Sequence, residues 1–134
     1  MHELIDTVAW IHLRGRLVLG TRSRGKDLFF IPGGKRHPGE SDLDTLVRET
    51  HEELTVRLDP DTARHFGTYE APASPHSPVP RVRMACYTAA FSGEPEPSAE
   101  IEEMAWLGYA ERFRTPPVDR LVFDELLARG WIEG

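Results

Sequence analysis

The sequence contains a single cysteine, Cys86, among 134 residues, so the chain cannot form an intramolecular disulfide bond. This excludes the class of small secreted domains that are held together by several disulfides. No apolar run approaches the roughly 18 residues that cross a membrane. The N-terminus, Met1–Glu3, also lacks the charged start and apolar centre of a signal peptide. We therefore expect a cytoplasmic protein that has no membrane partner.

Basic residues are outnumbered as well. Sixteen lysines and arginines stand against 22 acidic residues, which gives a net charge of −6. A long nucleic acid is therefore not an expected partner, whereas a small anion remains compatible with a metal ion or a few local arginines. The length is that of one domain, so we expect a single domain over residues 1–134. The sequence leaves open whether this domain is a monomer or a homodimer.

Apolar periodicity predicts a mixture of strands and helices. Strands are expected at 4–13 and 16–21, joined by a turn at Arg14–Gly15, and again at 28–31, 65–70, 81–91 and 103–107. Helices are expected at 41–54 and 118–129, and the proline-containing stretches 71–80 and 92–98 are expected to be loops. Strands and helices do not alternate regularly, which favours a mixed sheet between helices over a doubly wound parallel sheet.

The most informative segment joins a Pro32-Gly33-Gly34 turn to the predicted helix at 41–54. Ser41 is a favourable N-cap residue, and Asp44 three positions later nearly completes a capping box. One face of the helix carries residues at spacings of three and four that would pack into a core: Leu43, Leu46, Val47, Thr50 and Leu54.

The same helix gathers three carboxylates, Glu49, Glu52 and Glu53, on neighbouring turns. Their mutual repulsion costs roughly 0.2–0.5 kcal/mol per exposed pair, so a positive group among them is expected. Carboxylate oxygens suit hard cations such as Mg²⁺, which commonly completes its coordination with phosphate oxygens. The adjacent Arg48 could hold one carboxylate in a fixed orientation through charge-assisted hydrogen bonds.

These residues resemble the signature of the Nudix hydrolases. The matching positions are Gly34, Glu40, Arg48, Glu49, Glu52, Glu53 and Val56. Thr50 stands where an aliphatic residue is usual; its methyl group can still pack, and its hydroxyl could bond to the preceding turn. Thr55 stands where glycine is usual. We expect the helix to end there with a different geometry, because the left-handed conformation is costly for threonine.

The resemblance implies an α/β fold, a Nudix-type α/β/α sandwich with a mixed sheet and a loop-helix-loop catalytic motif. It also implies metal-dependent hydrolysis of a diphosphate linkage in a nucleoside diphosphate joined to another group. Mg²⁺, with Mn²⁺ as a substitute, would be bound by Glu49, Glu52, Glu53 and the carbonyl of Gly33 or Gly34. Many family members have a glutamate ahead of a tryptophan like Trp106; here Glu100, Glu102 and Glu103 precede it, and we select Glu100. The implied catalytic residues are Arg48, Glu49, Glu52, Glu53 and Glu100, with Glu49 or Glu100 orienting the water.

The substrate is less well defined. Arg22, Lys35 and Arg36 are predicted to contact phosphate, although solvated loop charges are an equal alternative for each. Trp10 and Phe30 could stack on a base, but aromatic residues in strands are more often core residues. The compounds left open are oxidised nucleoside triphosphates, dinucleoside polyphosphates, nucleotide sugars, ADP-ribose and isoprenoid diphosphates.

A second function class is a module of the same fold that binds a nucleotide-like ligand without cleaving it. The carboxylate set argues against this reading, because a pure binder does not need three repelling acids on one helix.

Overall fold

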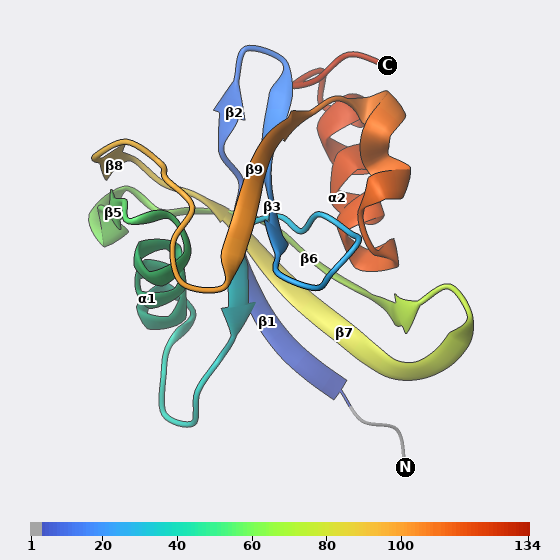
Figure 1. Ribbon diagram of the computed structural model, residues 1–134, viewed down its shortest axis with the longest axis horizontal. Coiled ribbons are helices and arrows are strands. Elements are labelled where there is room, and N and C mark those ends of the chain that lie inside the picture. The colour runs from blue at the N-terminus through green and yellow to red at the C-terminus, as the bar shows by residue number, and fades with distance from the viewer. Residues whose placement is uncertain (1–3) are drawn as a thin grey trace.

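The computed structural model describes residues 4–134 (Figure 1). Met1–Glu3, on which the signal-peptide expectation rests, lie outside the described residues. Among the residues from 4 to 134, no helix is long and apolar enough to span a membrane. The helices are α1 (Asp42–Leu54), α2 (Pro117–Ala128) and the 3₁₀ helices η1 (Pro60–Thr62) and η2 (Tyr109–Arg114). The strands are β1 (Leu4–Trp10), β2 (Leu13–Arg14), β3 (Leu17–Ser23), β4 (Gly33–Lys35), β5 (Arg57–Leu58), β6 (Arg64–Ser74), β7 (Ser77–Thr88), β8 (Phe91–Ser92) and β9 (Ile101–Leu107).

The central sheet is mixed, as the sequence predicted. Its strand order is β4-β1-β7-β6; β1 and β7 run parallel and the other neighbours antiparallel. A second, antiparallel sheet has the order β2-β3-β9, and β5 pairs with β8. In Figure 1, α1 and α2 lie on opposite sides of these sheets. The α/β/α arrangement is therefore confirmed.

Side chains at the end of β1 and at Ile11, the residue after it, alternate between two hydrophobic cores. Ala9 and Ile11 pack in the core that includes α2, whereas Val8 and Trp10 pack in the core that includes α1. Trp10 is fully buried, and its indole nitrogen donates to the carbonyl of Ala89 at 3.3 Å. It is therefore a core residue, and stacking of a ligand on Trp10 is excluded.

The predicted loop over 71–80 is wrong. β6 continues to Ser74, and β7 begins at Ser77, so the two strands form one long hairpin (Figure 1). The prolines are tolerated because β6 is an edge strand, and β7 pairs with β1 only from Arg81 onward. At these positions the missing proline N–H groups interrupt no central ladder.

Two strand predictions also need correction. Residues 28–31 form no strand; they make only one bridge, between Phe30 and Thr21. The first strand ends at Trp10, and a hairpin whose turn is Gly15–Arg16 joins the separate strand β2 to β3. In both places backbone groups find partners outside the expected ladder: the amide of Phe29 donates to Arg114 at 2.8 Å, and that of Leu19 to His12 at 2.9 Å.

Helix α1 begins as predicted. Ser41 and Asp44 form a complete capping box, and the Thr50 hydroxyl donates to the carbonyl of Leu46 at 2.8 Å. The expectation for the helix end is wrong, because Thr55 adopts the left-handed conformation with φ 66°. Its amide donates to the carbonyl of His51 at 2.9 Å, as a glycine would at this position.

Candidate active site

A cavity of about 500 Å³ lies between β1, β3, β7 and the beginning of α2. Most of its wall is apolar, with Ile5, Met84 and Val118 among the contributing residues. A few polar side chains interrupt this wall: Thr7, Thr21, Ser23, Lys26, Lys35, Glu53 and Asp119. A largely apolar pocket with a few polar groups is typical of a small-molecule site.

Arg48 of helix α1 bonds to the end of strand β4 and to Glu40 in the loop that follows it. Its Nε and Nη2 donate to the two carboxylate oxygens of Glu40, each at 2.8 Å, and its Nη1 donates to Glu49 Oε1 at 2.9 Å. Nη2 also donates to the carbonyl of Lys35 at 3.2 Å. The hydrogen bonds from Arg48, followed by that from the His37 amide, lower the pKa of Glu40 to about 2. This planar fork therefore fixes the orientation of both glutamates.

Glu53 lies in an environment that shifts its pKa in the opposite direction to that of Glu40. Only 7% of it is exposed, and the amide of Gly33 donates to its Oε1 at 3.2 Å. Burial raises the pKa of Glu53 to about 8, and the charges of Glu49, Glu100 and Glu52 add to the effect. Burial likewise raises the pKa of Glu49, although Arg48 opposes the change. Within residues 4–134, no ion pair includes Glu53. Its negative charge is therefore poorly compensated.

The predicted turn at Gly33 and Gly34 is wrong, because both residues lie in strand β4 and pair with β1. A side chain at Gly33, whose φ is +152°, would overlap the carbonyl oxygen of Val8. A Cβ at Gly34 would lie 2.5 Å from the carboxyl carbon of Glu49. The backbone of β4 is therefore brought directly against the carboxylates of α1. This proximity is compatible with the predicted role of a glycine carbonyl as a metal ligand.

The structure brings Glu100 to this cluster from the turn before β9. The loop that leads to it is attached to the end of α1: the amides of Glu96 and Ser98 donate to the carbonyls of Leu54 and Glu53, respectively, both at 2.9 Å. The Glu100 charge raises the pKa values of Glu49 and Glu53. This effect is compatible with the predicted role of Glu100 beside the α1 carboxylates.

The predicted phosphate ligands divide into two groups. Lys35 lines the cavity, and so does Lys26, which the sequence did not single out. Arg22 instead pairs with Glu103 at 3.0 Å and with Glu102 at 3.4 Å. Arg36 pairs with Asp6 and, at 2.7 Å, with Asp42. Neither arginine lines the cavity, so the geometry favours Lys35 as the phosphate contact.

Asp119 is a cavity residue that the sequence reasoning missed. It lies in the first turn of α2, is 2% exposed, and accepts the amide hydrogen of Ile31 at 2.8 Å. Burial raises the pKa of Asp119 to about 7. A sequence signal existed, because an acidic residue stands beside Val118 and three positions before Val122, on the apolar side of the helix.

The sequence matches the NUDIX domain family over residues 5–126. The chain belongs to the Nudix family. Its fold resembles the Escherichia coli ORF135 protein, with 23% identity, a TM-score of 0.73, and coverage of 95% of this chain and 91% of that one. A MutT protein from Methanosarcina mazei Go1 gives 18% identity and a TM-score of 0.72, with 96% of each chain covered.

A third structure is a Francisella tularensis bifunctional NMN adenylyltransferase/ADP-ribose pyrophosphatase complexed with AMP and a Mn ion. It gives 18% identity and a TM-score of 0.67, and covers 98% of this chain and 43% of that one. At these identities the likenesses show the Nudix fold alone. No curated protein matches this chain.

The Nudix residues present hard oxygen donors that fit a divalent cation. Glu49 and Glu53 are largely buried, like-charged and only partly neutralised, whereas Glu52 is half exposed. In the part of the chain that the structure describes, no three Asp, Glu, His or Cys side chains converge into a ready-made metal group. Arg48 instead engages Glu49 and approaches Glu52 to 3.6 Å. The donor types fit a metal, and its binding would compete with Arg48 for these carboxylates.

Proposed function

We propose that this Nudix protein is a pyrophosphohydrolase that cleaves the diphosphate linkage of a small nucleotide-type compound in the presence of Mg²⁺ or Mn²⁺. The observation that carries the proposal is Glu53, a buried carboxyl at the wall of the cavity. The charges of Glu49, Glu100 and Glu52 act on it, and among residues 4–134 the single hydrogen bond to its carboxylate comes from the amide of Gly33 at 3.2 Å. A cation beside it would relieve this unfavourable charge.

The residues that would hold the metal are Glu49, Glu52 and Glu53, together with the carbonyl of Gly33 or Gly34. When bound, a divalent ion supplies positive charge at the diphosphate and lowers the pKa of water. Glu40 has another role in this proposal: its carboxylate already accepts hydrogen bonds from Arg48, His37 and Thr45, so it orients the arginine.

The chain's own groups would position the attacking water. Glu49 is held by Arg48 at 2.9 Å, which keeps its carboxylate in one orientation. Glu100 reaches the same cluster from the turn before β9 and is the second candidate to orient or deprotonate water. Lys35 and Lys26 at the cavity wall would hold the phosphates of the substrate.

The shape of the cavity supports a substrate with one compact apolar group. A volume of about 500 Å³ lies in the range of small-molecule sites. Phe30, which is 39% exposed and lines the cavity, provides an aromatic face against which a base could stack. The AMP and Mn ion in the Francisella tularensis structure support the choice of a nucleotide-type compound and of a divalent metal.

The test is a panel of diphosphate compounds: a nucleoside triphosphate, a dinucleoside polyphosphate, a nucleotide sugar, ADP-ribose and an isoprenoid diphosphate. Each is incubated with Mg²⁺, with Mn²⁺ and with a chelator, and phosphate and nucleotide release are measured. We expect metal-dependent hydrolysis of one class by the wild type. We expect little hydrolysis by Glu53→Gln.

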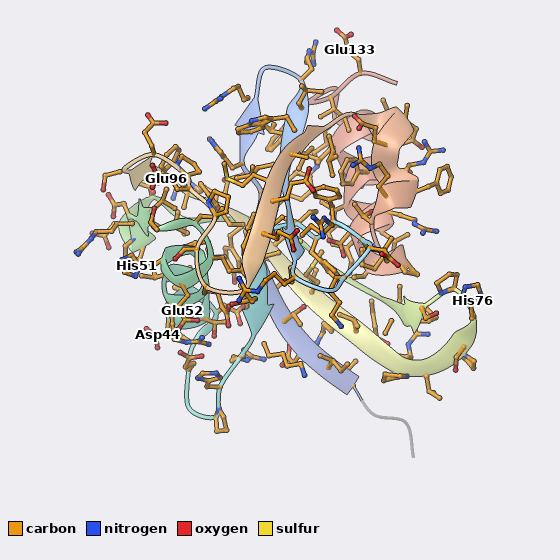
Figure 2. All side chains as sticks on the ribbon, in the orientation of Figure 1. Asp44, His51, Glu52, His76, Glu96 and Glu133 are labelled. Atoms are coloured by element: carbon orange, nitrogen blue, oxygen red, sulfur yellow. The ribbon has the colours of Figure 1, made fainter. Side chains whose placement is uncertain are left out.

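The matched control is Glu133→Gln, an exposed glutamate far from α1 (Figure 2). This variant should hydrolyse the same compound at the wild-type rate. Metal-dependent binding without hydrolysis of any compound would contradict the proposal and indicate the non-catalytic binding module instead.

A further inference from the structure

The turn that carries Glu100 adopts an unusual backbone. Ala99 has φ +55°, a left-handed conformation that L-residues other than glycine seldom adopt. The amide of Ile101 donates across the turn to the carbonyl of Ser98 at 3.0 Å. An alanine retains this conformation only when its surroundings hold it there. The contacts of the turn should therefore show what fixes Glu100.

Arg24 holds the turn from one side with two hydrogen bonds. Its backbone amide donates to the carbonyl of Glu100 at 2.9 Å, and its guanidinium Nη1 donates to the carbonyl of Ala99 at 3.2 Å. The two acceptors are consecutive, so one residue fixes both peptide groups that flank the Glu100 Cα. The regular pairing of β3 with β9 shifts register after Arg22, which places Arg24 beside the turn.

Helix α1 holds the loop from the other side. The carbonyls of Glu53 and Leu54, at the end of α1, accept the amides of Ser98 and Glu96, each at 2.9 Å. Glu53 thus contributes its carboxylate to the cavity and its carbonyl to the loop that leads to Glu100. The turn that carries Glu100 is therefore held by hydrogen bonds from Arg24, and the loop before it by hydrogen bonds to the end of α1.

We propose that Arg24 is a positioning residue that fixes Glu100 relative to Glu49 and Glu53. Within residues 4–134, no ion pair includes Arg24, so its guanidinium is committed to the turn and not to a carboxylate. Arg24 does not line the cavity, which separates its role from that of a phosphate ligand. The inference rests on the proposed function, because a positioned Glu100 matters for catalysis only if Glu100 acts in hydrolysis.

The first experiment needs no substrate. Backbone ¹⁵N relaxation is measured for the metal-free wild type and for Arg24→Met, which keeps the aliphatic stem and loses the guanidinium. We expect the order parameters of Ala99 and Glu100 to fall from about 0.85 toward 0.6. The matched control is Arg64→Met, another exposed arginine whose guanidinium donates to a backbone carbonyl, that of Ala63 at 3.4 Å. It should leave the turn unchanged.

The second experiment is a double-mutant cycle on hydrolysis of the panel compound that the wild type cleaves fastest. We expect Arg24→Met to lower kcat about three- to tenfold with KM nearly unchanged, and Glu100→Gln to lower it further. Adding Arg24→Met to Glu100→Gln should cause no additional loss. Arg24→Lys, which keeps a donor on a long stem, should recover most of the activity.

The outcomes separate the two claims. Unchanged order parameters at 99–100 in Arg24→Met would overturn the positioning role whatever the activity. The positioning role would also be overturned if Arg24→Met lowered kcat by the same factor in the wild-type and in the Glu100→Gln background. Wild-type kcat in Glu100→Gln would instead remove Glu100 from the proposed mechanism. If Arg24→Met does not fold, the same measurements are made on Arg24→Gln, whose amide is too short to reach Ala99.

Discussion

Two glutamates of the same signature, Glu40 just before helix α1 and Glu53 near its C-terminal end, lie in opposite electrostatic environments. At the N-terminal end, Glu40 accepts two hydrogen bonds from Arg48, and its pKa is about 2. At the C-terminal end, Glu53 is buried, accepts one weak backbone hydrogen bond, and has a pKa of about 8. The difference shows that burial and charged partners, not membership of the signature, set the pKa of each glutamate.

The largest effect is expected from replacing Glu53, the carboxyl that has no cationic partner among residues 4–134. Glu53→Gln should lower turnover about 100-fold or more, since a neutral amide supplies no charge to a metal. The fold should remain intact, because the amide is nearly isosteric and can still accept the Gly33 hydrogen bond. Steady-state kinetics with Mg²⁺, together with a circular dichroism melt, measures both. Wild-type turnover by a folded Glu53→Gln variant would refute the proposed role of Glu53 in hydrolysis.

The next effect is the pH dependence of stability in the metal-free protein. The pKa of Glu53 is raised from 4.5 to about 8 and that of Asp119 from 3.8 to about 7, so the folded protein binds more protons than the unfolded chain between these values. The free energy of unfolding should therefore fall as pH rises from about 5 to 8, and level off above 8. Each group contributes at most about 1.4 kcal/mol per pH unit.

Urea unfolding at pH 5, 6, 7 and 8 in chelator measures this slope. Glu53→Gln should reduce it at pH 6–8, and Asp119→Asn at pH 5–7, because each variant removes one group whose pKa is higher in the folded protein than in the unfolded chain. Glu133→Gln, at an exposed position, should follow the wild type. A slope that neither variant reduces would show that these two carboxyls do not titrate as described.

A smaller effect is expected from replacing Glu40, the glutamate that is paired with Arg48. Glu40→Gln leaves Arg48 with weaker hydrogen bonds to a neutral amide, so the melting temperature should fall by about 2–6 °C. The lowered pKa of Glu40 also means that its contribution is present above its ordinary value of 4.5 and is lost as pH falls toward 2. Melting curves at pH 7 and pH 3 test this: the variant and the wild type should differ less at pH 3.

The smallest effect is expected just beyond Glu53, at Thr55. Thr55→Gly should relieve a left-handed backbone that costs threonine about 1 kcal/mol, partly offset by the greater freedom of glycine in the unfolded chain. We expect a melting temperature higher by about 1–3 °C and unchanged kinetics. A lower melting temperature would show that the hydroxyl of Thr55, which donates to Leu54 at 2.5 Å, contributes more than the strain costs.

Local sequence determined the central part of the site. The cap at Ser41, the apolar stripe of α1 and the spacing of its glutamates are set by contacts within four residues, so they could be predicted without tertiary information. The two glycines were identified as well, but their place in strand β4 and their close approach to Val8 and Glu49 depend on contacts far apart in the chain. The match over residues 5–126 and the mixed α/β fold agree with the family that this segment indicated.

Tertiary structure decided the rest, because the partners are far apart in the chain. The amide of Ile31 bonds to the carboxylate of Asp119, 88 residues away, so residues 28–31 leave the strand ladder that their β propensity favours. Arg24 and Glu100 meet only because β3 pairs with β9. The same carboxyl group is an ion-pair partner at Glu40 and an uncompensated acid at Glu53, since burial and neighbouring charge are properties of the folded molecule.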